Sequence, residues 1–392
     1  MKKTILALLI FCMVGVASAQ TEKPERIVTF VKEMHNAAWY AHQADLWEKE
    51  VNRNPGNDDA WYFWFTATRY RLIFDANEHN RPNQYDEAPL KSIASRLHRE
   101  RPKSFARYII DHECEHLLND CEGLEDHMIQ AIRMRPDFKE LYPVYVGYLL
   151  ANGKDDMMAD ILKQWYDTGE YSYVLLSYAY NSLAGMEENG ILFVNGDVPT
   201  YSSLLVQFGK GLFRDKLIIN RSLLFIPEYR DMVCSRLGVK PFEAPDDNSN
   251  DGLRKWEADL IFSIAHNTGR PVYFSSLDNQ PQLEDHLYSE GLVMRYSTRR
   301  YDNLSVKRRN FESVYFKDYL YETFVPETYN SSAYGTNLNY IPCFKSLLTF
   351  YKTEGLKKEY DELHGLMMHI LSQCEGIEDD AILKHYYDEI ER

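Results

Sequence analysis

The feature that most constrains the fold is a set of three short, uninterrupted apolar runs in the middle of the chain. They are ILFV at Ile191–Val194, LII at residues 217–219 and VYF at residues 272–274. Continuous apolar runs without polar alternation are typical of strands that are covered on both faces. Enough chain lies between successive runs for a covering helix, so the pattern predicts parallel strands joined by right-handed crossovers.

Helical patterns are predicted on both sides of these strands. Apolar residues recur there at helical spacing. Before the strands, the stop-turn at residues 54–57 and the phrase AIRMRP at residues 131–136 fit about two degenerate tetratricopeptide units. After the strands, Gly355 separates two predicted helices that would form a helical hairpin.

The predicted fold is therefore mainly α with an α/β insert. Tetratricopeptide-like helical repeats would flank a small parallel-sheet α/β module. The expected boundaries are a helical domain at residues 20–185, the α/β module at 186–300 and C-terminal helical hairpins at 301–392.

The first nineteen residues predict export. Lys2 and Lys3 precede an apolar run at residues 4–16, and ASA at residues 17–19 fits a signal-peptidase site, so we expect cleavage before Gln20. No later apolar stretch approaches the roughly eighteen residues of a membrane-spanning helix. The expected location is therefore periplasmic or secreted, without a transmembrane segment after cleavage.

The charge balance bears on the possible partners. Lys and Arg number 44 against 59 Asp and Glu, which gives a formal net charge of −15. Sequence-independent nucleic-acid binding draws most of its free energy from basic side chains that neutralise phosphates. We therefore expect no nucleic-acid partner. The chain has no CxxC pair, so neither a redox pair nor a ribbon-type zinc site is predicted.

One motif with catalytic chemistry is HECEH, which satisfies H-E-x-x-H. On a continuous helix, His112 and His116 would face the same side and could bind zinc, while Glu113 activated a water molecule. Glu122 is the candidate third ligand, although Asn119 stands where related zinc sites have a glycine. In the repeat frame, however, His112 falls at a tightly packed position. We favour a structural helix without a cofactor, with zinc as the alternative.

A second candidate site lies where the three predicted strands end. Ligands of open parallel sheets bind beyond the carboxyl ends of the strands. That edge would gather Asn195, Asp197, Asn220, Arg221 and Ser275 as ligand-binding residues. The alternative is a tight Asn-Gly-Asp turn in which Asp197 caps the following helix. The chain has no GxGxxG or Walker-type loop that would support a nucleotide site.

Four segments carry a family resemblance. They are GILFVNGD at 190–197, LIINRSLL at 217–224, RPVYFS at 270–275 and GLVMRY at 291–296. In this order they resemble the soluble C-terminal part of multi-span membrane proteins of Bacteroidetes described as O-mannosyltransferase-like, an uncharacterised family. The resemblance covers roughly residues 189–374. It implies the fold, an envelope location, and a link to envelope glycan or glycoprotein biology.

The chain also departs from that family. The membrane-embedded part, where glycosyl transfer would occur, is missing from it. The family's Asn-Gly-Asp is typically followed by Asn-Asp-Thr, whereas this chain has VPT at residues 198–200. The resemblance therefore carries no expectation of transferase activity.

Taken together, the sequence predicts an exported, non-catalytic binding or interaction protein of the bacterial cell envelope. Its expected partner is an envelope protein or a glycan ligand. Two enzymatic alternatives remain open at this point. One is a zinc metallopeptidase that uses the H-E-x-x-H motif, and the other is a glycan-active enzyme at the strand ends.

Overall fold

The computed structural model describes residues 22–391 apart from several short gaps, which are residues 31, 82–83, 115–123, 241, 244–248, 276–280 and 328. The chain divides into two compact units. Unit 1 comprises Met1–Val28 and Met34–Phe138, and unit 2 comprises Thr29–Glu33 and Lys139–Arg392. The predicted helical domain at 20–185 therefore spans unit 1 and the first part of unit 2. No helix in the described ranges has the length and apolar character needed to cross a bilayer.

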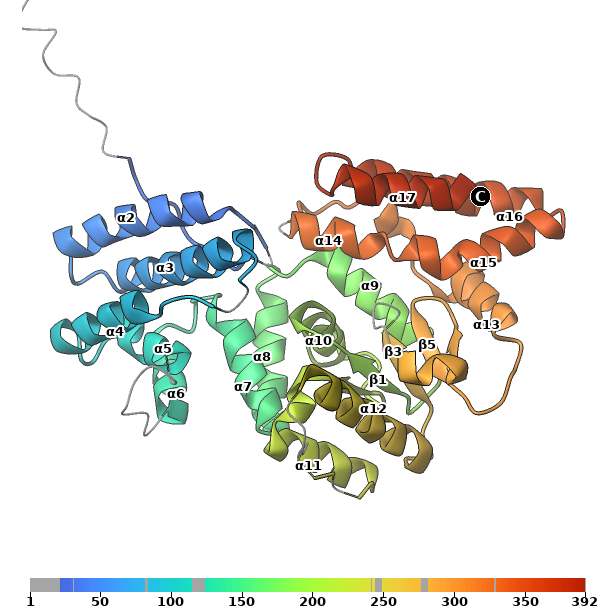
Figure 1. Ribbon diagram of the computed structural model, residues 1–392, viewed down its shortest axis with the longest axis horizontal. Coiled ribbons are helices and arrows are strands. Elements are labelled where there is room, and N and C mark those ends of the chain that lie inside the picture. Colours follow the sequence, from blue (N-terminus) through green and yellow to red (C-terminus); the bar gives the residue numbers. More distant parts are fainter. Residues whose placement is uncertain are drawn as a thin grey trace, which may run out of the picture. The chain divides into compact units, whose positions relative to one another are not determined.

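Unit 1 is built from helices that pack in sequence order, as Figure 1 shows in blue to cyan. Asn36 and Asn57 begin the first two helices by accepting hydrogen bonds from backbone N–H groups at their amino ends. The two helices pack along each other. The described helices of the unit are α2 (Ala37–Arg53), α3 (Asp58–Glu78), α4 (Ala88–Glu100), α5 (Phe105–Glu113) and α6 (Leu124–Met134).

Unit 2 surrounds a small sheet with helices (Figure 1). Three helices precede the sheet: α7 (Leu141–Ala151), α8 (Asp155–Asp167) and α9 (Tyr173–Ala184). Three more connect its strands: α10 (Asp197–Leu204), α11 (Pro227–Leu237) and α12 (Asn250–Asn267). The rest follow the sheet: α13 (Asn303–Arg309), α14 (Asn330–Asn337), α15 (Tyr340–Thr353), α16 (Lys357–Cys374) and α17 (Asp380–Glu391).

The sheet has five strands in the order β2-β1-β3-β5-β4. Strand β1 (Ile191–Val194) pairs in parallel with both β2 (Leu217–Asn220) and β3 (Val272–Ser275). The prediction of three parallel strands is therefore confirmed. The sheet is mixed, however, because β5 (Val293–Tyr296) and β4 (Leu287–Ser289) add in antiparallel pairing.

The apolar runs form strands that the folded chain buries on both faces, as β1 shows. The four residues of β1 are at most 2% exposed, and the Phe193 ring stacks on Phe274 of β3 with centroids 5.2 Å apart. Each such side chain contributes about 1.5–3 kcal/mol when it leaves water. The predicted fold class, mainly α with an α/β module, is confirmed.

A buried amide on α9 contacts the C-terminal part of the chain. Asn181 of α9 is fully buried, and its Nδ2 donates to the Phe316 carbonyl oxygen (2.7 Å) and to the Tyr340 hydroxyl (2.8 Å). The Phe316 N–H donates in return to the Asn181 Oδ1 (2.7 Å). Further on, Gly355 has a φ of +68° between α15 and α16. The predicted helical hairpin is thus present, with glycine where a left-handed residue is required.

Candidate ligand pocket at the sheet edge

The parallel pairing brings the carboxyl ends of three strands to one edge. Val194 lies opposite Asn220 in the register, and Phe193 lies opposite Phe274. The five residues predicted as ligand-binding groups follow or end these strands. They therefore share an edge as expected, but their side chains serve different purposes.

Four of the five support the edge itself. The buried Asn220 donates from Nδ2 to the Thr200 Oγ1 (3.0 Å), which ties β2 to α10. The Arg221 guanidinium pairs with Glu257 of α12 at 3.0 Å. The remaining two are Asn195, whose Oδ1 accepts a hydrogen bond from the Ser222 hydroxyl at 2.9 Å, and Ser275, which is buried in the ladder opposite Val293.

Asp197 is the exception, because it lines a pocket. It is the first residue of α10, and the preceding Gly196 is the N-cap with a φ of +81°. No side chain caps this helix. The alternative in which Asp197 serves as the cap is therefore wrong. The positive φ at position 196 favours glycine, and the Asp197 carboxylate does not cap the helix.

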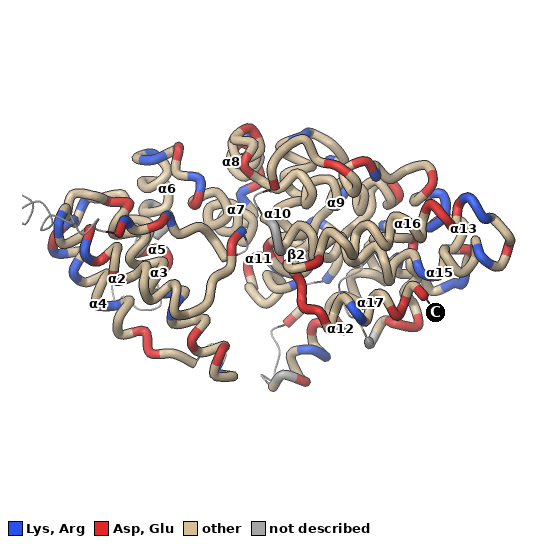
Figure 2. Tube along the Cα trace, turned by 90° about the horizontal axis from the view of Figure 1, so that it is seen from above, with Lys and Arg blue, Asp and Glu red and all other residues tan. Residues whose placement is uncertain are grey.

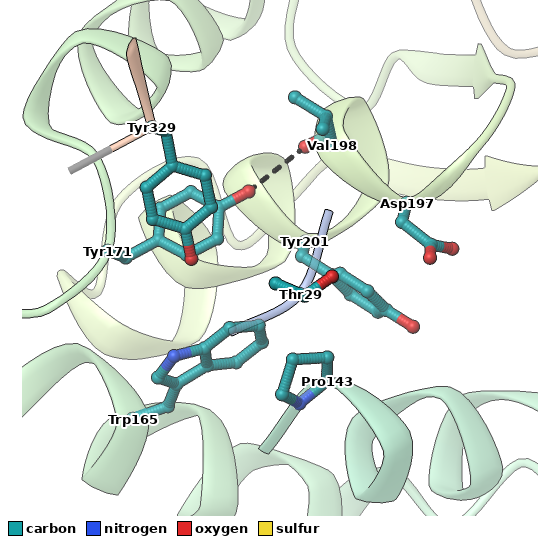
Figure 3. Close-up of a pocket in the computed structure, with 8 residues that line it drawn as sticks. All are labelled: Thr29, Pro143, Trp165, Tyr171, Asp197, Val198, Tyr201 and Tyr329. Atoms are coloured by element: carbon teal, nitrogen blue, oxygen red, sulfur yellow. Dashed lines mark hydrogen bonds between the residues drawn. The ribbon is translucent and has the colours of Figure 1, made fainter. Parts of the chain in front are cut away.

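The pocket is lined mainly by aromatic side chains from separate parts of unit 2 (Figure 3). Trp165 lies on α8, Tyr171 just before α9, Tyr201 on α10 and Tyr329 just before α14. The cavity volume is about 40 Å³. The other lining residues are Thr29, Pro143, Asp197 and Val198.

The rings are fixed against one another at steep angles. Trp165 meets Tyr171 edge to face at 5.3 Å and an interplanar angle of 87°, and meets Tyr201 at 5.6 Å and 61°. The Tyr171 and Tyr329 centroids are 5.0 Å apart. The Tyr171 hydroxyl donates to the carbonyl oxygen of Val198 at 3.3 Å, as the dashed line in Figure 3 marks. Tilted and edge-to-face pairs are preferred packing geometries of aromatic rings.

One acidic residue of the aromatic cluster is already paired. Glu170 accepts the Trp165 indole N–H (2.9 Å) and forms an ion pair with Lys32 (2.8 Å). The Lys32 ammonium also lies over the Tyr329 ring, 5.2 Å from its centroid. Through these contacts the segment Thr29–Glu33, which belongs to unit 2, is held against the cluster.

Asp197 differs from Glu170 because its carboxylate has no hydrogen-bond or ion-pair partner among the described residues. Although Asp197 as a residue is exposed, desolvation by the surrounding protein raises the pKa of its carboxyl. Burial also raises the pKa of Tyr171, Tyr201 and Tyr329. The tyrosine hydroxyls are therefore neutral at physiological pH, and Asp197 is the acidic residue among those that line the pocket.

The H-E-x-x-H motif lies only partly in the described chain. Helix α5 ends at Glu113, and the Glu113 carboxylate forms an ion pair with Arg69 of α3. His112 is half-buried near the end of this helix, whereas His116 and Glu122 lie outside the described residues. Over the described ranges, no group of three or more His, Cys, Asp or Glu side chains is placed to hold a metal ion.

The aromatic members of the pocket were not predicted from the sequence. The chain has 29 Tyr and 6 Trp, so a high aromatic content was the only available signal, and it does not single out four positions.

Comparison with known proteins gives no indication of the function. No family model, curated protein or solved structure matches this chain.

Proposed function

We propose that this chain is an exported, non-catalytic binding protein of the bacterial cell envelope, and that unit 2 takes a glycan ligand at the aromatic pocket. The observation that carries the proposal is the cluster of Trp165, Tyr171, Tyr201 and Tyr329 beside Asp197 at the carboxyl edge of parallel strands. Binding sites of α/β proteins favour that edge. The half-buried Tyr201 ring can pack on the C–H face of a sugar at the rim, and a carboxylate accepts hydrogen bonds from sugar hydroxyls.

The envelope part of the proposal rests on the sequence. The predicted leader at residues 1–19 supports a periplasmic or secreted location. The resemblance to O-mannosyltransferase-like proteins of Bacteroidetes supports a link to glycan or glycoprotein handling. An envelope protein is the other partner class, and absence of binding by every oligosaccharide tested would favour it.

The carboxylates near the pocket favour binding over glycoside hydrolysis. Hydrolysis generally uses two Asp or Glu residues that flank the bond, with one acting as acid and the other as base or nucleophile. Here Asp197 lines the pocket, but Glu170 is occupied by Lys32 and by the indole of Trp165. A third carboxylate, Glu327, accepts hydrogen bonds from the Ser172 hydroxyl and the Tyr329 N–H, both at 2.8 Å. A carboxylate that is already ion-paired is a poor acid at neutral pH. A binding role therefore accounts for the arrangement better than the glycan-active enzyme.

A titration of the mature chain with defined oligosaccharides tests the proposal. The panel contains linear oligomers of glucose, mannose, N-acetylglucosamine and glucosamine. Calorimetry measures the affinity of each. Tyr201→Ala removes a half-buried ring of the pocket, and Tyr180→Ala is the matched control on α9, half-buried against Phe213. A stacking ring contributes about 1 kcal/mol, so the first variant is expected to weaken binding by roughly fivefold or more.

The control variant should bind within twofold of the parent chain, since Tyr180 does not line the pocket. The proposal is overturned if no oligomer of the panel binds at millimolar concentration. It is also overturned if both tyrosine variants lose affinity equally, because the ligand would then sit elsewhere on unit 2.

A further inference from the structure

The size of the pocket limits what can enter it. Its cavity volume is about 40 Å³. About 10–15 Å³ of such volume holds one water molecule, so the pocket accommodates about three groups of that size. A whole sugar ring does not fit inside. The pocket must therefore receive a substituent of the ligand, while the rest of the ligand lies at the rim.

The rings of the pocket favour a positively charged substituent. An ammonium group is attracted to the electron-rich faces of Trp and Tyr, and most strongly where water is excluded. Trp165 and Tyr329 are at most 3% exposed, and Tyr171 is 8% exposed. The faces that a guest would meet are therefore largely shielded from water.

The same cluster already holds one ammonium group of the chain itself. Lys32 lies over the Tyr329 ring and takes Glu170 as its counter-ion. Asp197, at the other side of the cluster in Figure 3, is a second carboxylate without a cationic partner in the described chain. Asp197 and Glu170 thus differ, because in the described chain only Glu170 is matched by a basic group.

A neutral substituent would fit this environment poorly. The methyl group of an N-acetyl substituent would cover Asp197 without compensating its charge, and burying an unpaired carboxylate is costly. A primary ammonium group offers three N–H donors and a full charge. The formal net charge of −15, with Asp and Glu distributed over both units in Figure 2, also attracts cations over longer distances.

We infer that the pocket binds a primary ammonium group, presented by a glycan that contains a free amino sugar, with Asp197 as the counter-ion. This inference rests on the proposed function, because it names the chemical group by which the glycan would be recognised. Trp165, Tyr171 and Tyr201 enclose the ammonium group, and the sugar ring that bears it lies at the rim.

The test compares two oligomers of equal length, one of glucosamine and one of N-acetylglucosamine, on the mature full-length chain at a pH below the pKa of the sugar amines, so that these amines are charged. Asp197→Asn keeps the shape of the side chain and removes its charge. Asp160→Asn is the matched control, because Asp160 is an exposed acid on α8 away from the pocket. A trilysine peptide serves as a non-glycan source of ammonium groups.

The glucosamine oligomer is expected to bind at least tenfold more tightly than its N-acetylated counterpart. Asp197→Asn should reduce its affinity at least tenfold, whereas Asp160→Asn should change it less than twofold. Tyr201→Ala should weaken the same complex, which places the ligand at the pocket.

Other outcomes overturn the inference in distinguishable ways. The ammonium assignment is refuted if the N-acetylated oligomer binds as tightly as the glucosamine oligomer or more tightly, and if this binding is lost in Tyr201→Ala but not in Asp197→Asn. The proposed glycan binding would then still stand. Tighter binding of trilysine than of the glucosamine oligomer, lost in Asp197→Asn, refutes the amino sugar and identifies a protein lysine as the ligand. Absence of binding by every probe refutes both proposals.

Discussion

Replacing Asn181 with alanine should lower the free energy of unfolding of unit 2 by about 3 kcal/mol. The side chain is fully buried and makes three hydrogen bonds of 2.7–2.8 Å to Phe316 and Tyr340. Each such bond contributes about 1 kcal/mol net. Because Tyr329 lies between Phe316 and Tyr340 along the chain, Asn181 fixes both flanks of the segment that supplies this ring to the pocket.

Urea denaturation followed by circular dichroism and tryptophan fluorescence measures this change, with the midpoint shifting at constant slope. For a unit of this size, about 3 kcal/mol corresponds to a fall in melting temperature of roughly 6–12 °C. Ser182→Ala is the matched control. Ser182 is the next residue on α9 and is also buried, but its hydroxyl donates only to the Tyr178 carbonyl oxygen within the same helix.

The control variant should stay within about 1 kcal/mol of the parent chain, since alanine is the better helix former and one local bond is lost. The reasoning is refuted if the two variants unfold at the same denaturant concentration. That result would mean that water replaces the Asn181 contacts without net cost.

Three further predictions concern the pocket and the H-E-x-x-H motif. Glu170→Gln keeps an acceptor for the Trp165 indole but leaves Lys32 without its counter-ion, so tryptic cleavage after Lys32 should become faster in limited proteolysis; an unchanged rate argues against the ion pair. Desolvation raises the folded-state pKa of Asp197, so its contribution to stability is present at low pH and is lost as pH rises through that pKa. Asp197→Asn should therefore unfold at neutral pH no more readily than the parent chain in urea, and a clear loss of stability would contradict this. Elemental analysis should find no stoichiometric zinc, because His112 falls at a tightly packed position of the repeat frame, and Glu113, which would activate the water molecule, is paired with Arg69; about one zinc per chain would restore the metallopeptidase alternative.

The parallel part of the sheet was predictable because strands that are buried on both faces consist of continuous apolar runs. Ile191–Val194 is apolar at every position, and both of its neighbours in the sheet are similar runs. The antiparallel strands were not predicted as such. β5 carries Arg295, whose guanidinium pairs with Glu187, and β4 is only half-buried, so neither has a continuous apolar run.

The candidate site was predictable only in part, for a different physical reason. Sequence order places polar residues at the strand ends, but it does not say which of them are used to hold the edge together. Asn220 forms a hydrogen bond with Thr200, and Arg221 forms an ion pair with Glu257. Asp197 does not cap α10, because Gly196 is the N-cap residue. Trp165 and Tyr171 are close in sequence, but Tyr201 and Tyr329 lie far from them along the chain, and only folding brings the four rings together.

The most direct test of the central claim is a nitrogen-15 NMR titration of the tryptophan indole groups with a glucosamine oligomer. The chain has 6 Trp, and the Trp165 signal is assigned by its loss in Trp165→Phe. Because the Trp165 ring lines the pocket, its indole resonance is predicted to shift on binding while those of the other tryptophans stay in place. Saturation by the oligomer without a shift of Trp165, or with shifts confined to the other indoles, would contradict the account.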